Sequence, residues 1–95
     1  MLEKYFDEEE LKEVYEGYEE SVLANLDEKN IQNIINYLEK NTTITKDILL
    51  YYLDLFTIDV NEFIRKFEKL KQLLGENYEI LLENKMDYLE RMYTL

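Results

Sequence analysis

The chain has no cysteine, no histidine, no proline and no tryptophan, and only two glycines among its 95 residues. Without cysteine there can be no disulfide framework and no thiolate metal site, and nothing points to an oxidising compartment. Without histidine the chain lacks the commonest general base and the commonest metal ligand. The absence of proline fits a helical chain with short polar connections. These absences argue first against an enzyme.

The polar residues that are present do not assemble a recognisable catalytic or metal motif. Ser21 is the only serine, and there is no histidine or cysteine to activate it. Gly17 and Gly75 stand alone, not in a phosphate-binding loop. There is no EF-hand loop and no Glu-x-x-His pair. We therefore expect a protein without catalytic activity, metal or other cofactor.

The length and hydropathy indicate one small soluble domain spanning residues 1–95. Apolar residues make up 46% of the chain, which is enough for a core and argues against disorder. The acidic N-terminal segment MLEKYFDEEE has no apolar stretch typical of a signal peptide. The longest apolar run, Ile48 to Leu53, is far shorter than the roughly 20 residues of a membrane span. We expect a cytoplasmic protein that does not enter a membrane.

Four helix-start signals recur along the chain, each with a capping residue directly after a large apolar one. Glu10 and Glu62 are placed to complete reciprocal capping boxes, and Asn30 is a weaker candidate for the same role. Gly75 follows a long apolar stripe, where a helix-ending residue with positive φ is expected. The four start pairs are Phe6-Asp7, Leu26-Asp27, Ile44-Thr45 and Ile58-Asp59.

The apolar spacing between these signals is helical throughout, so we predict an all-α, compact bundle of about five short helices. A 32-residue repeat in the spacing relates residues 26–57 to 58–95 and predicts two stacked helical hairpins with an N-terminal acidic helix. The alternative is that two amphipathic hairpins simply look alike. The spacing is similar to the helical repeats of mitochondrial transcription termination factor-like proteins, but those use basic surfaces. The predicted helices are 8–24, 28–40, 46–56, 60–74 and 78–93, the last with a break at Asn84.

The negative charge is concentrated at the N-terminal end. The formal net charge is -11, of which residues 1–30 carry -8 (11 acids, 3 bases) and residues 31–95 carry -3 (11 acids, 8 bases). Such a chain is repelled by bare nucleic acid and by anionic membrane surfaces. We therefore expect neither as a direct partner.

Four acids of the predicted helix 8–24 fall on one stripe. Axial separations of about 4.5 to 6 Å would resemble the phosphate spacing of a nucleic-acid strand. Tyrosines of the opposite stripe would supply contact area, because tyrosine is enriched in interfaces. The alternative is an ordinary solvated helix face, since glutamate is a good helix former. The candidate partner-binding residues are Glu9, Glu13, Glu16, Glu20, Tyr15 and Tyr18.

These features predict a non-catalytic binding module that occupies the basic groove of a nucleic-acid-binding protein, for example a nuclease. In size and charge the chain is similar to small acidic phage and mobile-element inhibitors, including anti-CRISPR and other DNA-mimic proteins. The alternative is a structural or regulatory homo-oligomer using apolar surface from Ile48 to Phe56 or around Met86, Leu89, Met92 and Tyr93. A basic group at Arg65, Lys66, Lys69 and Lys71 could meet the acidic helix of a second copy, although its spacing favours ordinary surface patterning. A helix-turn-helix reading of 46–74 has the required loop length but too much acid nearby.

Overall fold

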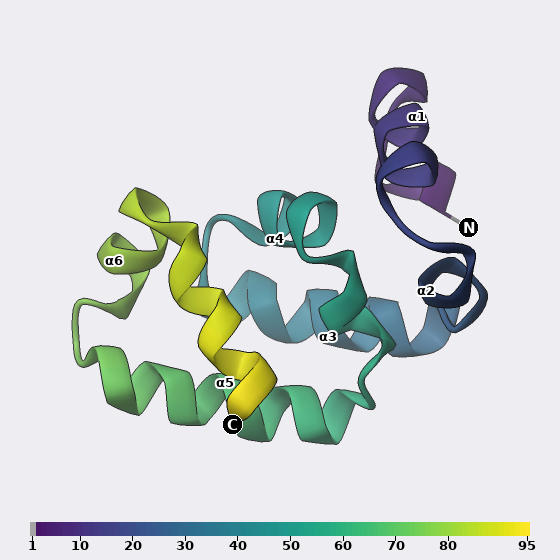
Figure 1. Ribbon diagram of the computed structural model, residues 1–95. Coiled ribbons are helices and arrows are strands. Elements are labelled where there is room, and N and C mark those ends of the chain that lie inside the picture. The colour runs from purple at the N-terminus through teal and green to yellow at the C-terminus, as the bar shows by residue number, and fades with distance from the viewer. Residues whose placement is uncertain (1) are drawn as a thin grey trace.

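The structure, a computed structural model, describes residues 2–95 and is all-helical, which confirms the predicted fold class. Within these residues there is no strand. None of their helices combines the length and the hydropathy of a membrane span. In the labels of Figure 1, α denotes an α-helix, and η denotes a 3-10 helix in the text. The elements in chain order are η1 (Leu2–Lys4), α1 (Glu8–Gly17), α2 (Glu20–Ala24), α3 (Glu28–Asn41), α4 (Thr45–Tyr51), η2 (Leu53–Thr57), α5 (Val60–Leu74), α6 (Tyr78–Asn84) and η3 (Met86–Thr94).

The two longest helices, α3 and α5, pack on each other and form the body of the molecule (Figure 1). Each is followed by a seven-residue α-helix and then by a 3-10 segment. The order long helix, short helix, 3-10 segment therefore occurs twice, from α3 to η2 and from α5 to η3. This order agrees with the two helical hairpins predicted from the 32-residue spacing.

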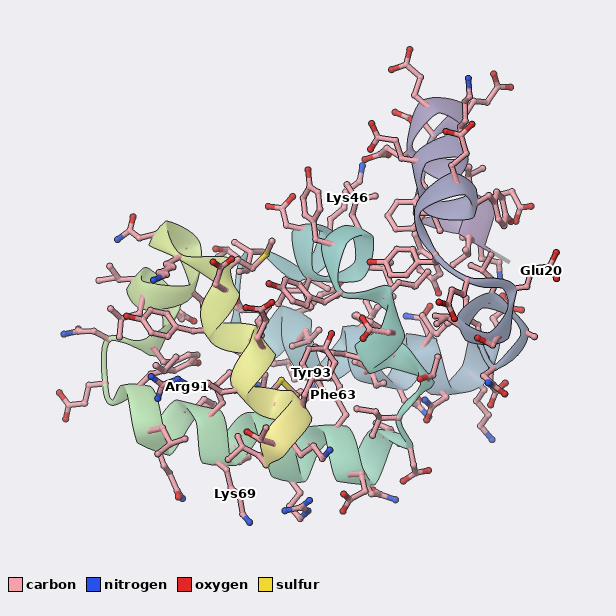
Figure 2. The ribbon with its side chains drawn as sticks, viewed as in Figure 1. Glu20, Lys46, Phe63, Lys69, Arg91 and Tyr93 are labelled. Carbon is pink, nitrogen blue, oxygen red and sulfur yellow. The ribbon has the colours of Figure 1, made fainter. Side chains whose placement is uncertain are left out.

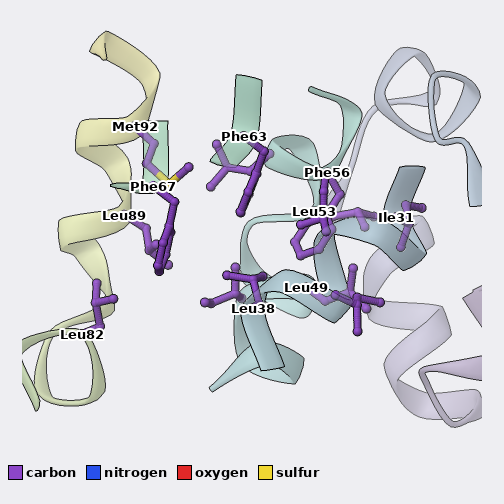
Figure 3. Close-up of a cluster of buried hydrophobic side chains, with 14 of the residues drawn as sticks. Ile31, Leu38, Leu49, Leu53, Phe56, Phe63, Phe67, Leu82, Leu89 and Met92 are labelled. Carbon is purple, nitrogen blue, oxygen red and sulfur yellow. The ribbon is translucent and has the colours of Figure 1, made fainter. Parts of the chain in front are cut away.

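Most of the hydrophobic core lies between these two halves (Figure 3), and Leu2, Phe6 and Val14 extend it toward the N-terminus. The rings of Phe63 and Phe67 stack with centroids 6.1 Å apart, and the Tyr37 ring meets Phe67 edge-on at 5.7 Å. Aromatic contacts of this geometry add to the free energy gained from burial alone. The core side chains labelled in Figure 3 are Ile31, Leu38, Leu49, Leu53, Phe56, Phe63, Phe67, Leu82, Leu89 and Met92.

Three of the four predicted N-caps are confirmed. Asp7 and Glu10 form the full capping box, while Asp27 and Asp59 each accept a hydrogen bond from the backbone two residues on. The fourth prediction was wrong, because α4 begins at Thr45 itself and the buried Thr45 hydroxyl has no hydrogen-bond partner. Glu62 also departs from its predicted capping role and pairs with Arg65 instead.

Asn30 has a tertiary role that replaces its predicted part in a capping box. Its side-chain amide donates to the backbone oxygens of Phe56 and Ile58, at 3.2 and 2.7 Å. Its side-chain oxygen accepts from the Val60 amide at 2.9 Å. One half-buried side chain thus satisfies three backbone groups where η2 passes into α5, and it ties the start of α3 to that connection.

Three of the predicted helices are broken in the structure. The predicted helix 8–24 divides into α1 and α2, and 46–56 divides into α4 and η2 around Tyr52. The predicted break in 78–93 is confirmed, although the residue between α6 and η3 is Lys85 and not a capping Asn84. Apolar periodicity does not distinguish these cases, because helical spacing persists across a short break.

The two glycines have different roles. Gly75 follows α5 with φ +83° and ψ -166°, a region that is open essentially to glycine alone, so the predicted helix end is confirmed. Gly17 is the last residue of α1, and a Cβ there would meet nothing within 4 Å. Close approach of a neighbouring helix is therefore not the reason for Gly17.

Candidate partner-binding surface

Helix α1 stands at one end of the molecule and projects beyond the body (Figure 1). Val14 is its only buried residue, and Leu11 is partly buried against the core. The Lys46 ammonium of α4 lies 3.1 Å from the Glu10 carboxylate and links α1 to the body (Figure 2). A helix attached by so few side chains leaves most of its circumference to solvent.

The start of α1 accounts for part of the negative charge. The Glu10 amide donates to the Asp7 carboxylate at 2.9 Å, and the Asp7 amide donates to Glu10 at 3.0 Å. Glu8, Glu9 and Glu10 occupy the first turn, where the helix dipole favours acids. This stabilisation fades within a turn, so it does not explain the acids further along α1.

Three of the four predicted stripe acids share one exposed face of α1. Glu9, Glu13 and Glu16 follow the i, i+4, i+7 spacing of a single helix face, and all three are exposed. Within residues 2–95 none of the three makes a hydrogen bond or an ion pair. Their axial separations are about 6 and 4.5 Å from the helical rise. The α1 acidic face, as we call these three residues, is a row of unneutralised carboxylates.

Glu20 does not belong to this row, and the prediction of one continuous stripe was wrong. Glu20 is exposed but begins α2, beyond an extended stretch at Tyr18 and Glu19 (Figure 2). The four acids were placed on one stripe because a single helix 8–24 was assumed.

Tyr18 supplies the physical reason for the break. Its hydroxyl donates to the Leu50 backbone oxygen at 3.0 Å and accepts from the Leu53 amide at 3.1 Å. These bonds hold the side chain against the junction of α4 and η2, and the Tyr18 backbone adopts φ -116° and ψ 146°. Burial raises the pKa of the Tyr18 hydroxyl, although the Leu53 hydrogen bond opposes the rise. Tyr18 is therefore partly buried and engaged within the protein, whereas it was predicted to contact a partner.

Tyr15 is the tyrosine of α1 that remains available. Its side chain is 52% exposed, and its hydroxyl makes no hydrogen bond within residues 2–95. Tyr15 lies about 100° around the helix from Glu16 and about 160° from Glu13, so it projects from a different side of α1 than the α1 acidic face. An exposed tyrosine ring there adds contact area where a partner covers more than one side of α1.

Three other tyrosines make hydrogen bonds to residues that are distant in the chain. The Tyr37 hydroxyl donates to Glu68, and the Tyr78 hydroxyl donates to the Asn41 backbone oxygen at 2.6 Å. Tyr5 likewise donates to Gln32 at 2.8 Å. The high tyrosine content thus has a structural use in which each ring packs and each hydroxyl finds a distant partner.

The apolar surface predicted for a homo-oligomer is mostly core. Ile48, Leu49, Leu53, Leu55 and Phe56 are buried, and so are Leu89 and Met92 of the C-terminal face. Tyr51 and Tyr93 remain exposed, at 60% and 48%. These two stretches were predicted as surface because sequence spacing shows an apolar face without showing what covers it.

The basic group on α5 lies away from α1 and is partly neutralised (Figure 2). Arg65 forms a bidentate pair with Glu62 at 2.8 and 2.9 Å, and Lys71 lies 3.1 Å from Glu68. Lys66 and Lys69 make no ion pair within residues 2–95. The pairing of two of the four bases agrees with surface patterning.

A cleft that the sequence did not reveal opens between the end of α4 and η3. It has a volume of about 480 Å³ and is lined by Tyr51, Tyr52, Met86, Asp87, Glu90 and Tyr93. A second cleft, of about 320 Å³, lies between α1 and the end of α4 and includes Glu13, Gly17 and again Tyr51. Within residues 2–95 no three acids converge closely enough to hold a metal ion.

In comparisons with protein-family models, curated proteins and solved structures, nothing matches the chain. The exposed surface of the protein is therefore the guide to its function.

Proposed function

We propose that the protein is a non-catalytic binding module whose α1 acidic face occupies a basic, phosphate-binding groove of a nucleic-acid-binding protein. The observation that carries this proposal is the row of exposed carboxylates at Glu9, Glu13 and Glu16, none of which is neutralised within residues 2–95. Like charges along one helix face destabilise the free protein, so a row of this kind gains free energy when a cationic surface covers it.

The shape of the molecule supports the same function. Because α1 projects from one end and has a single buried residue, it can enter a groove without disturbing the core. The exposed Tyr15, on another side of α1, offers a rigid contact at low entropic cost where the groove wraps around the helix. An inhibitor built this way would act by excluding nucleic acid from its partner.

The test is competition with duplex DNA. A partner captured from host lysate at low salt is mixed with fluorescent DNA, and displacement by the protein is followed by anisotropy. We expect Glu13→Lys combined with Glu16→Lys to weaken competition by about tenfold or more, because two attractive contacts become repulsive. We also expect competition to weaken steeply as salt rises.

Glu76→Lys combined with Glu79→Lys is the matched control, because it makes the same change in net charge at two exposed, unpaired positions remote in sequence from α1. Equal losses for both double variants would contradict a specific role of α1, as would simultaneous binding of DNA and protein to the partner. A tight, salt-insensitive dimer in light scattering, with α1 left in solvent, would favour the homo-oligomer instead.

A further inference from the structure

The cleft between α4 and η3 has the chemistry of a site for a cationic side chain. Tyr51 and Tyr52 from the end of α4 and Tyr93 from η3 supply aromatic rings, and Asp87 and Glu90 supply carboxylates. No lysine or arginine lines the cleft. Aromatic faces and unneutralised carboxylates both favour a cation, and together they favour it more than either alone.

The 3-10 winding of η3 brings these groups together. Residues three apart eclipse one another in a 3-10 helix, so Asp87, Glu90 and Tyr93 lie on one face. In an α-helix the same three residues would be displaced by about 60° at each step. The second face of η3, with Leu89 and Met92, is buried in the core.

The third face of η3 carries Arg91, which contacts the Tyr88 ring. The Arg91 guanidinium lies 5.7 Å from the centre of the Tyr88 ring, and the Lys85 ammonium lies 5.8 Å from the same ring. Arg91 and Tyr93 lie on different sides of η3 (Figure 2). Lys85, Tyr88 and Arg91 line a neighbouring hollow of about 270 Å³ together with Asp87 and Glu90. Neither carboxylate makes an ion pair within residues 2–95, so both remain open to a cation in the cleft.

The hydroxyls of the cleft also suit a donor-rich ligand. The Tyr93 hydroxyl donates to the Asp54 carboxylate at 2.6 Å, which fixes that ring. The Tyr52 hydroxyl has no hydrogen-bond partner within residues 2–95. Burial raises the pKa of Tyr52, and the negative charges of Glu90, Asp87 and Asp54 raise it further, as expected for a hydroxyl surrounded by carboxylates.

We infer that this cleft receives an arginine side chain of a protein partner, with the guanidinium between the tyrosine rings and paired with Asp87 and Glu90. The planar guanidinium suits both stacking on tyrosine and paired hydrogen bonds to carboxylates. The choice of an arginine-bearing protein as the partner rests on the proposed function, because a phosphate-binding surface is rich in arginine. Tyr51 lines this cleft and the one beside α1, so a single basic surface could contact both.

The experiment uses the whole chain and a small probe. An acetylated, amidated Gly-Arg-Gly peptide is titrated into the labelled protein and followed by NMR, with the citrulline peptide as the neutral isostere. We expect saturable shifts at Tyr51, Tyr52 and Tyr93 with the arginine peptide and none with citrulline. The combination Asp87→Asn with Glu90→Gln should weaken binding about fivefold or more, because two exposed ionic contacts are lost.

The control Glu76→Gln with Glu79→Gln makes the same change in net charge outside the cleft and should leave the affinity within twofold. Shifts scattered over the surface, equal binding of citrulline, or equal losses for the two double variants would overturn the cleft assignment. Glu13→Gln with Glu16→Gln separates this result from the proposed function. If only the Glu13 and Glu16 substitutions weakened binding of the peptide, the assignment of the cleft would be wrong, and the proposed role of the α1 acidic face would be unaffected.

Discussion

Helix α1 and the α3–α5 body use the same residue types in different ways. Of the ten residues of α1 only Val14 is buried, whereas α3 and α5 bury four and three side chains respectively and pack on each other. Acids of the body are often paired, as Glu62 is with Arg65, while the α1 acidic face is not.

The contrast indicates a division of tasks. Stability resides in the body, where apolar burial dominates the free energy of folding. Negative charge is exposed on α1, where repulsion between neighbouring carboxylates destabilises that helix and not the body. If this division holds, substitutions in the body should change the free energy of unfolding, and charge changes on α1 should mainly change binding.

The largest effect is expected at Phe67, which is fully buried and touches three other rings. Phe67→Ala should lower the free energy of unfolding by about 3 to 5 kcal/mol, because it leaves a cavity in the core. Urea denaturation followed by circular dichroism measures it. Tyr15→Ala on α1 should change that free energy by less than about 0.5 kcal/mol. Similar losses of unfolding free energy for both variants would contradict the division of tasks between α1 and the body.

The two glycines should respond with opposite signs. Gly75→Ala should destabilise by about 1 to 3 kcal/mol, since an alanine is strained at φ +83°. Gly17→Ala should stabilise by about 0.4 to 1 kcal/mol, since the site has negative φ and open space. Thermal unfolding of both variants gives the signs. A stabilising Gly75→Ala would mean that the end of α5 can adopt another conformation.

Tyr18→Phe tests how α1 is joined to the body. The loss of its hydroxyl removes bonds to the Leu50 oxygen and the Leu53 amide and should cost about 1 to 2 kcal/mol. Tyr15→Phe is the matched control and should be neutral, because the Tyr15 hydroxyl makes no hydrogen bond within residues 2–95. Chemical denaturation of the two variants provides the comparison. Equal stabilities would mean that the Tyr18 bonds do not hold the junction.

The smallest effect concerns pH. Hydrogen bonds from Tyr37 and then from Lys71 hold the pKa of Glu68 below its ordinary value of 4.5. A carboxyl whose pKa is lowered by folding contributes stability above pH 4.5 and loses it as pH falls through the lowered pKa. Glu68→Gln should therefore cost less than about 1 kcal/mol at pH 7, because the side chain is half exposed.

The stability difference between Glu68→Gln and the unaltered protein should vanish at low pH. Denaturation at pH 7, 4 and 2.5 measures it. A difference that persisted at pH 2.5 would show that the Glu68 side chain acts through packing and not through its charge.

Much of the fold could be predicted because its signals are local. Asp7, Asp27 and Asp59 cap helices through atoms two or three residues away, and Gly75 ends α5 through its own φ. Apolar spacing also identified the core faces of α3 and α5. The exposure of Glu9, Glu13 and Glu16 followed from the same periodicity.

The remaining features of the fold could not be predicted from local sequence patterns, because they depend on contacts between groups far apart in the chain. Tyr18 interrupts the first predicted helix by bonding to residues more than thirty positions away. Asn30 spans a similar separation to reach the start of α5. Neither partner is visible in a periodicity, so Glu20 was assigned to a helix that it does not share with the other acids.

The sequence by itself therefore determined the all-helical class, three of the four predicted helix caps and the concentration of charge near the N-terminus. These follow from interactions within one turn and from composition. Only the tertiary structure decided where the helices break, which tyrosines stay exposed and that Asp87, Glu90 and Tyr93 share one face. Packing sets each of these, because the contacts that fix the breaks and bury one face of η3 join groups that are far apart in the chain.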